Sequence, residues 1–179
     1  EEVSEEDIRL MVETGHQSGT IDTEEQEFIQ NVFDFDDITV GEFATHRTDI
    51  DFLDIEDSAD QWEQTIFNTH HSFYPVCEGT SDHLLGILSV HDYFYLKDRS
   101  IENIRNNVLM QPYFVPETLS ADVLFRKMKK DHSKIAVVLD EYGGLFGIVT
   151  INDLVEQLVG KLEESEEDEV VQCDPDTWE

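Results

Sequence analysis

Two segments of this chain carry a hydroxyl and a carboxylate at the same spacing. Residues 86–92 read Gly-Ile-Leu-Ser-x-x-Asp and residues 147–153 read Gly-Ile-Val-Thr-x-x-Asp, which places the four side chains at Ser89, Asp92, Thr150 and Asp153. Such a pair caps a helix N-terminus, with the hydroxyl at the N-cap and the acid three positions on. It can also hold the hydroxyls of a ribose, and a helix N-terminus favours a phosphate nearby. Capping explains either segment alone, whereas two symmetry-related copies favour paired binding clefts.

The match extends beyond these segments when the chain is compared with itself at a displacement of 61 residues. Seven of 22 aligned positions are then identical, and the apolar and polar positions between them stay in step. A repeat of this kind indicates a tandem duplication. The identical positions are His71, Ser72, Val76, Leu84, Gly86, Ile87 and Asp92, which align with His132, Ser133, Val137, Leu145, Gly147, Ile148 and Asp153.

Each copy is predicted to fold as a β-α-β-β-α unit, from the helical and strand periodicities of its apolar residues. One such unit is too small to bury its sheet alone. We therefore expect an α/β fold in which the two copies pack sheet to sheet about a pseudo-twofold axis. The predicted elements are an early strand at 50–55 and 113–115, a helix at 62–67 and 123–128, a strand at 73–77 and 135–139, a turn at 78–82 and 140–144, and a second strand at 84–89 and 145–150, which runs into a final helix.

An acidic helical hairpin is expected to precede the copies. Ser4 with Asp7, and Asp22 with Glu25, each form a helix N-cap signature. A solvated face explains the acids of this region better than a calcium loop, because Ile38 occupies the third ligand position. The predicted domains are the acidic helices at 1–38, the first copy at 39–98, the second copy at 99–162, and an acidic tail or linker toward a further domain at 163–179.

The 179-residue chain has 42 acidic and 11 basic side chains, for a formal charge of −31. This charge excludes a general nucleic-acid binder and argues against direct docking on anionic lipid, since both require a basic surface. Residues 1–42 hold 14 acids and one base, and residues 163–179 hold nine acids and no base. Residues 97–134 are locally positive, with eight bases against five acids. The acidity therefore belongs mainly to the ends of the chain.

No catalytic residue is predicted, and the sequence assigns no metal ligand. Cys77 and Cys173 form no CxxC motif, and the histidines lack the spacing of zinc ligands. For His71 and His132, which precede buried strands, a structural hydrogen bond is a better explanation than metal ligation. The chain has no P-loop, no GxGxxG motif and no apolar run of about 20 residues. Because it begins at Glu1 and ends in an acidic stretch, we interpret it as a fragment of a longer protein.

The two copies resemble tandem CBS motifs, and within that group the chain is similar to CorC/HlyC (hemolysin C-like) and CNNM-type proteins. The resemblance covers roughly residues 4–165, including the acidic helices. Its most specific part is Asp-Glu-Tyr-Gly-Gly, since generic CBS motifs lack this block. The segments that carry the resemblance are 39–47, 72–76, 113–117, 140–144 and 147–154.

The resemblance implies a regulatory module that binds an adenine nucleotide, Mg-ATP or AMP, and modulates magnesium or other divalent-cation transport or efflux. It also implies an N-terminal transmembrane domain and a C-terminal domain in the intact protein, a position at the cytoplasmic face of the cell membrane, and a homodimer formed through the CBS motifs. The nucleotide-binding residues that it implies are Thr45, Arg47, Tyr74, Pro75, Val76, Thr150 and Asp153. A second, less consistently occupied nucleotide site is implied at Ser89, Asp92, Ile135, Ala136 and Val137.

Three residues depart from the family pattern. Ala44 and His46 replace a Met and a Pro, and Phe73 replaces an Arg that would meet a phosphate. Loss of the Pro removes a fixed φ that would order this loop. These departures keep open an alternative, in which the chain is a ligand-free dimerisation scaffold of the same membrane protein. A third hypothesis, the regulatory insert of a soluble enzyme, is disfavoured by the block at 140–144.

Overall fold

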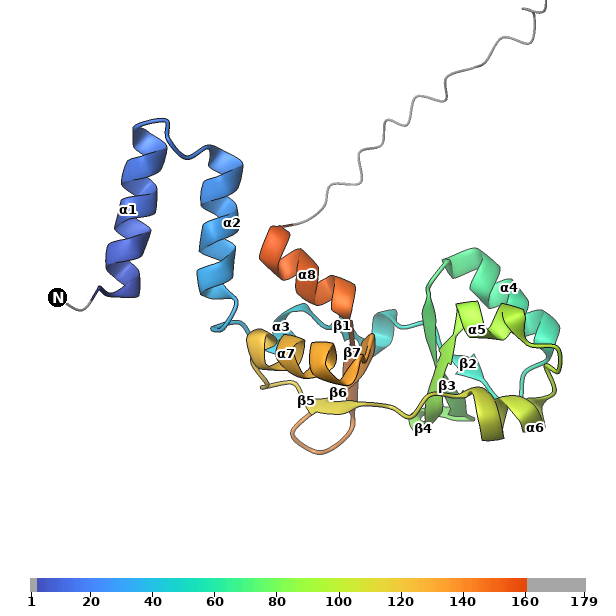
Figure 1. The fold of residues 1–179 in the computed structure, drawn as a ribbon. Coiled ribbons are helices and arrows are strands. Elements are labelled where there is room, and N and C mark those ends of the chain that lie inside the picture. Colours follow the sequence, from blue (N-terminus) through green and yellow to red (C-terminus); the bar gives the residue numbers. More distant parts are fainter. Residues whose placement is uncertain (1–2, 161–179) are drawn as a thin grey trace, which may run out of the picture.

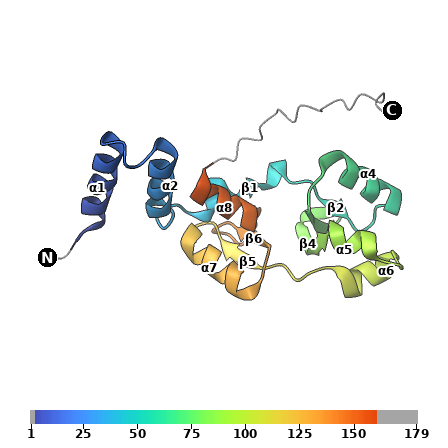
Figure 2. The same ribbon diagram turned by 45° about the horizontal axis from the view of Figure 1, so that its top comes forward.

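The computed structural model of the chain describes residues 3–160, which form a helical hairpin followed by two β-sheets with helices packed against them (Figures 1 and 2). The predicted acidic tail at 163–179 lies outside the described residues. In both figures the hairpin stands at one end of the molecule, next to helix α8, and the sheet of the first copy lies at the other end. The α/β fold with two paired copies is confirmed.

Both predicted capping boxes of the hairpin are present, the first between Ser4 and Asp7 and the second between Asp22 and Glu25. An ion pair 2.7 Å long joins Arg9 to the last residue of the second helix and holds the two helices together. The start of each hairpin helix is therefore set by a local capping box that can be recognised directly in the sequence. Its helices are α1 (Glu5–Gln17) and α2 (Thr23–Asp34).

Each copy follows the predicted order β-α-β-β-α. Its first two strands are parallel and its last two antiparallel, which gives the orders β2-β3-β4 and β5-β6-β7. The elements of the first copy are β2 (Leu53–Asp54), α4 (Ala59–Thr69), β3 (Phe73–Glu78), β4 (Thr80–Ser89) and α5 (Val90–Tyr95). Those of the second copy are β5 (Phe114–Pro116), α7 (Ala121–Asp131), β6 (Ile135–Leu139), β7 (Leu145–Thr150) and α8 (Ile151–Val159).

Two boundaries predicted for the first copy are wrong. The turn expected at 78–82 shrinks to Gly79, because a positive φ of 73° reverses the chain there and both neighbours belong to strands. The strand expected at 50–55 is confined to the two residues of β2. In the second copy the turn at 140–144 is confirmed, and the carboxylate of Asp140 accepts two backbone N–H groups within it, at 2.9 and 2.8 Å.

The segment at the start of each copy, before its first parallel strand, lies against the sheet of the other copy. β1 (Thr45–His46) runs antiparallel to β7 and so joins the second sheet. In the reverse direction, Met110 exchanges two backbone hydrogen bonds with Ile87 of β4, at 2.9 and 3.0 Å. This exchange interlocks the two copies across the predicted boundary between them. The connecting elements are α3 (Val40–Phe43), the 3-10 turn η1 (Arg47–Asp49), α6 (Ile101–Asn103) and the π turn η2 (Ile104–Val108).

Strand pairing reveals a one-residue slip within the repeat. Ser89 pairs with Phe73, and Thr150 pairs with Ile135. Equivalent residues of β3 and β6 are therefore 62 positions apart in the sequence, whereas those of β4 and β7 are 61 positions apart. The extra residue lies in the hairpin between β3 and β4, since six residues separate the paired Cys77 and Leu84 but only five separate the paired Leu139 and Leu145. The predicted equivalences of His71, Ser72 and Val76 with His132, Ser133 and Val137 are therefore wrong.

The buried core consists of three clusters. One lies within each copy, around Trp62 and Leu88 in the first and around Leu124 and Leu154 in the second. The third joins the copies, since Ile87 of the first sheet packs there with residues of the second sheet. The two sheets thus pack against each other, as the sequence predicts. The buried members of this third cluster are Ile87, Ile135, Val137 and Leu145.

Candidate functional site

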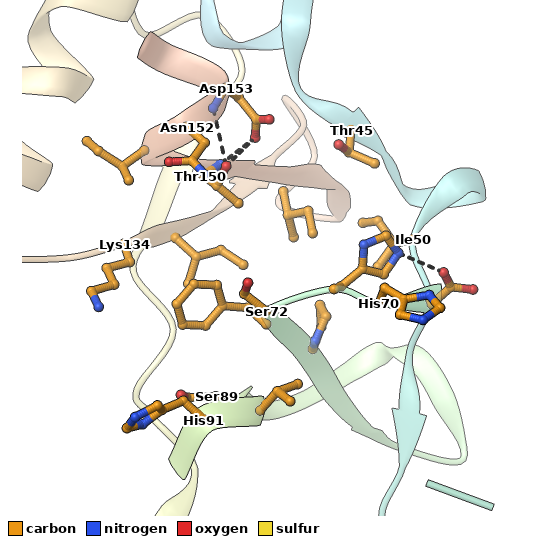
Figure 3. Close-up of a pocket in the computed structure, with 18 of the residues that line it drawn as sticks. Thr45, Ile50, His70, Ser72, Ser89, His91, Lys134, Thr150, Asn152 and Asp153 are labelled. Carbon is orange, nitrogen blue, oxygen red and sulfur yellow. Dashed lines mark hydrogen bonds and ion pairs between the residues drawn. The ribbon is translucent and has the colours of Figure 1, made fainter. Parts of the chain in front are cut away.

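A cleft of about 1290 Å³ opens between the two copies, where β4 runs into α5 and β7 runs into α8 (Figure 3). Both repeated hydroxyl–carboxylate pairs lie on its wall. Pockets for small molecules usually measure about 300–1,000 Å³. The cleft therefore has room for more than one ligand position.

The pair at the start of α8 forms a closed capping box. Thr150 N and Oγ1 donate to Asp153 Oδ2 at 2.6 and 2.9 Å, and Asp153 N donates to Thr150 Oγ1 at 3.3 Å (Figure 3). The capping interpretation of this pair is thus confirmed. Both bonds that the carboxylate accepts use Oδ2, which leaves Oδ1 for a ligand hydroxyl.

The equivalent pair at the start of α5 is arranged differently. Asp92 N donates to Ser89 Oγ at 3.3 Å, but the carboxylate Oδ1 of Asp92 lies 3.2 Å from His91 Nδ1 instead of closing the box. The hydrogen bond with His91 and, after it, the bond with Ser89 lower the pKa of Asp92. This pair therefore presents an ionised carboxylate on the wall of the cleft.

Seven of the twelve predicted site residues line the cleft, and the other five do not. Those that line it come from both copies, so the two predicted sites share one continuous space. The lining residues are Thr45, Pro75, Thr150 and Asp153 of the first predicted site and Ser89, Asp92 and Ile135 of the second. The residues that do not line it are Arg47, Tyr74, Val76, Ala136 and Val137.

Strand alternation explains most of these misplacements, because neighbouring side chains of a strand point to opposite faces. Pro75 lines the cleft, whereas Tyr74 and Val76 on either side of it pack in the core of the first copy. Ala136 packs in the core of the second copy, and Val137 in the cluster between the sheets. The side chains of these four residues therefore do not line the cleft, and their part in nucleotide binding stays a prediction.

Arg47 is exposed at the start of η1 and lies outside the residues that line the cleft. The neighbouring His46 orders this loop in another way than a proline would. Its Nδ1 accepts the backbone N–H of Thr48 at 3.4 Å, and its ring packs edge-on against Phe146, with centroids 5.3 Å apart. The loss of the family's Pro is thus partly offset by side-chain contacts.

The structure also brings charged residues to the cleft that sequence reasoning missed. We call the side with Thr45 and Asp153 the first half-cleft, and the side with Ser89 and Asp92 the second half-cleft. With Thr45 and Asp153 we group the other charged lining residues of segments 45–51 and 70–71 and of α8, which are the acids Asp49, Asp51 and Glu156 together with His70 and His71. With Ser89 and Asp92 we group His91, His132 and Lys134, which also line the cleft. Figure 3 shows Lys134 and His91 on one side of the cleft, and Thr45 and His70 on the other.

The histidines of the cleft have identifiable structural roles. His71 Nε2 lies 3.0 Å from Asp51 Oδ2, which confirms the structural hydrogen bond predicted for His71. His70 and His132 end α4 and α7 in the left-handed conformation, with φ of 59° and 53°. Their equivalence appears only at a displacement of 62 residues, and for this reason a search at 61 residues missed it.

Two further sequence expectations concern metals and membranes. Within residues 3–160, no three His, Cys, Asp or Glu side chains are grouped so that they can hold a metal ion. None of the helices in this described part of the chain combines the length and the hydropathy that a bilayer crossing requires.

Comparison with known proteins identifies the family. The profile of the CBS domain matches residues 104–160. A UPF0053 protein of Synechocystis is 34% identical over 95% of the chain and 39% of its own length. A polyamine export protein of Haemophilus influenzae is 31% identical over 98% of the chain and 41% of its own length. The chain thus spans about two fifths of the length of these curated relatives.

Solved structures agree with this assignment. The CBS domain of a bacterial CNNM/CorC family Mg²⁺ transporter superposes with a TM-score of 0.80 at 28% identity, over 90% of this chain and 99% of that one. A structure of such a domain in complex with ATP superposes with a TM-score of 0.70 at 26% identity, over 77% and 99% of the two chains. From its repeats, its fold and these relatives, the chain belongs to the CBS-domain pairs of the CorC/HlyC and CNNM family.

Proposed function

We propose that this chain is the nucleotide-sensing module of a membrane transporter. It binds an adenine nucleotide, Mg-ATP or AMP, and thereby modulates transport of magnesium or another divalent cation by an attached membrane domain. The observation that carries the proposal is the Thr150–Asp153 pair on the wall of a cleft large enough for a nucleotide. The ATP complex of a similar CBS domain supports the choice of ligand.

The charge of the first half-cleft gives a physical reason for the metal. It contains four carboxylates, and neither Lys nor Arg is among its lining residues in the described part of the chain. A tetra-anionic nucleotide that enters it is repelled, and Mg²⁺ bound to the phosphates relieves part of this repulsion. The four acids are Asp49, Asp51, Asp153 and Glu156.

Regulation requires that the nucleotide binds more tightly in one state of the transporter than in the other. We propose that the module acts as a homodimer through its CBS motifs, at the cytoplasmic face of the membrane, and that its boundaries are those predicted from the sequence. The polyamine export relative makes an organic cation the competing cargo. Flux of Mg²⁺ and of spermidine through the full-length protein separates these two cargos.

Calorimetry of this chain with ATP, with and without Mg²⁺, tests the binding proposal. We expect one Mg²⁺-dependent binding event that Asp153→Asn weakens about 10- to 100-fold, since a hydrogen bond to a charged group contributes about 1.5–3 kcal/mol. Asparagine is preferred to alanine because its oxygen can still accept the Thr150 N–H and keep the start of α8 capped. Glu25→Gln is the matched control, since it makes the same kind of change in the capping box of α2, which does not line the cleft.

Absence of ATP binding with Mg²⁺, or undiminished binding by Asp153→Asn, contradicts the proposal. The alternative, a dimerisation scaffold without ligand, is favoured by the closed capping box of Thr150 and by Phe73, which replaces a family cation. Ligand-independent dimers in analytical ultracentrifugation, together with no nucleotide heat, support that alternative.

A further inference from the structure

A groove of about 380 Å³ lies between α7 and α8, distinct from the cleft between the copies. Its lining is partly apolar and partly basic, and no carboxylate is among its lining residues in the described part of the chain. The apolar side chains are those of Phe125, Met128, Ile151 and Val155, and the lysines are Lys129 and Lys134.

The two lysines of the groove have no acidic partner among residues 3–160. Lys129 and Lys134 are exposed and form no ion pair there, whereas Arg126 on α7 is paired with Asp122. Acids outnumber bases by 42 to 11 in this chain, so two neighbouring lysines without an acid are an exception. The groove is therefore suited to an occupant that is both acidic and apolar.

We propose that the groove binds residues 166–171 of this same chain. They belong to the acidic segment that follows α8, outside the described residues. They read Glu-Glu-Asp-Glu-Val-Val, so four consecutive carboxylates precede two apolar side chains. The carboxylates complement the lysines of the groove, and the valines complement its apolar surface.

The chain is long enough for this segment to reach the groove. Ile151 and Val155 of α8 line the groove, and the helix ends at Val159. A helix of nine residues is about 13 Å long. The stretch from Gly160 to Glu166, when extended, spans up to about 20 Å. A segment tethered at this distance has an effective concentration of about a millimolar, so weak contacts suffice to populate the docked state.

A second copy of the chain is the competing occupant. In a symmetric dimer built on this groove, the same face of α7 from both copies would meet, and the lysines of the two grooves would repel each other. The acidic segment of the same chain meets the groove without this repulsion. Its docking leaves the other faces of the CBS motifs available to the proposed homodimer.

The groove shares part of its wall with the nucleotide cleft. His132, Lys134 and Ile151 line both spaces. Four carboxylates docked in the groove therefore offset the positive charge of Lys134 at the edge of the cleft. The docking itself requires no nucleotide, so it can be tested whether or not the proposed function holds.

Paramagnetic relaxation enhancement, measured by NMR on the whole chain without nucleotide, tests the docking. A nitroxide is attached to Cys173, which follows the docking segment closely, while the other cysteine, Cys77, is buried. We expect the amide signals of Met128 and Val155 to be broadened, and those of α4 in the first copy to be unaffected. Added salt is expected to weaken the broadening, since exposed charges are screened.

Lys129→Glu is expected to lower the docked fraction at least about threefold, because it removes one ion pair and adds a repulsion. Lys97→Glu is the matched control, since it reverses the same charge at an exposed position that does not line the groove, and it is expected to leave the broadening unchanged. Replacing the acids at 166–169 by their amides is expected to act as Lys129→Glu does.

A mixture of spin-labelled chain with unlabelled chain enriched in nitrogen-15 separates contacts within one chain from contacts between chains. The inference is overturned if the signals of the groove are not broadened, or if Lys129→Glu or the amide variant broadens them as the wild type does. Broadening of equal strength in the mixture also overturns it, because the occupant is then the acidic segment of a second copy.

Discussion

Gly147→Ala is expected to destabilise this protein more than any other glycine-to-alanine change in its sheets. A Cβ at Gly147 would lie 2.3 Å from the carbonyl oxygen of Thr45, a backbone atom of β1 that cannot swing aside as a side chain can. The substitution therefore separates β1 from β7. We expect a loss at or above the upper end of the ~1–3 kcal/mol range for overpacked sites, measured by urea denaturation.

The equivalent glycine of the first copy provides a graded comparison. A Cβ at Gly86 would lie 2.8 Å from Leu109 Cβ and 3.0 Å from Met110 O, which is close but less severe. We expect Gly86→Ala to destabilise the protein less than Gly147→Ala does. Thr80→Ala, at an exposed site on β4, is expected to stay within about 0.5 kcal/mol of the wild type. If Gly147→Ala behaves like Thr80→Ala, β1 is not held at this close approach.

Both glycines mark the places where a segment from the other side of the molecule crosses a sheet. The sequence displays them as matching positions of a repeat, but it does not say what passes over them. That information is long-range, since β1 lies at the start of the first copy and pairs with the last strand of the second. Only the folded chain shows that a glycine is required here because of a backbone neighbour.

What the sequence predicted well is local. The capping boxes of Ser4 and Asp22 depend on residues three apart, and the buried strands at 73–77 and 135–139 depend on short apolar runs. These signals need no knowledge of distant neighbours. The order of elements within each copy follows from them, whereas the pairing of the copies and the cleft between them were predicted from the tandem repeat.

What the sequence predicted poorly depends on register. A comparison without gaps aligned Val76 with Val137, although the hairpin between β3 and β4 contains one residue more than that between β6 and β7, so that Val76 corresponds to Val138. Neighbouring side chains of a strand face opposite sides, so the short runs 74–76 and 135–137 each combine one residue that lines the cleft with others that are buried away from it. Lys134 was missed because the slip aligned it with Phe73, whereas its counterpart is Ser72.

The two halves of the cleft show how charge can divide the roles of duplicated sites. Duplication preserved the pair of hydroxyl and carboxylate in each half, but the residues around the pairs diverged. Asp153 uses one carboxylate oxygen to cap α8, while Asp92 turns its carboxylate to His91. The symmetry of the fold therefore does not imply that the two halves prefer the same ligand. The preference of each half depends on its own lining residues.

Leu154→Ala is expected to cause the second large loss of stability. Leu154 is fully buried on α8, in the core cluster of the second copy, next to the Asp153 that lies on the cleft wall. Removal of such a side chain costs about 2–5 kcal/mol, or roughly 4–20 °C in the midpoint of thermal unfolding for a chain of this size. Val155→Ala is the matched control on the same helix, since Val155 is 37% exposed, and its loss is expected to stay below about 1 kcal/mol.

The effect of Leu154→Ala should reach the first copy as well. The exchanged segments, together with the cluster of Ile87, Ile135 and Val137, tie each sheet to the other. Hydrogen exchange followed by mass spectrometry of peptides from β3–β4 and from β6–β7 is then expected to show equal loss of protection in both copies. If β3–β4 keeps its protection while β6–β7 loses it, the copies unfold separately, and the interlocking of their sheets does not make them one cooperative unit.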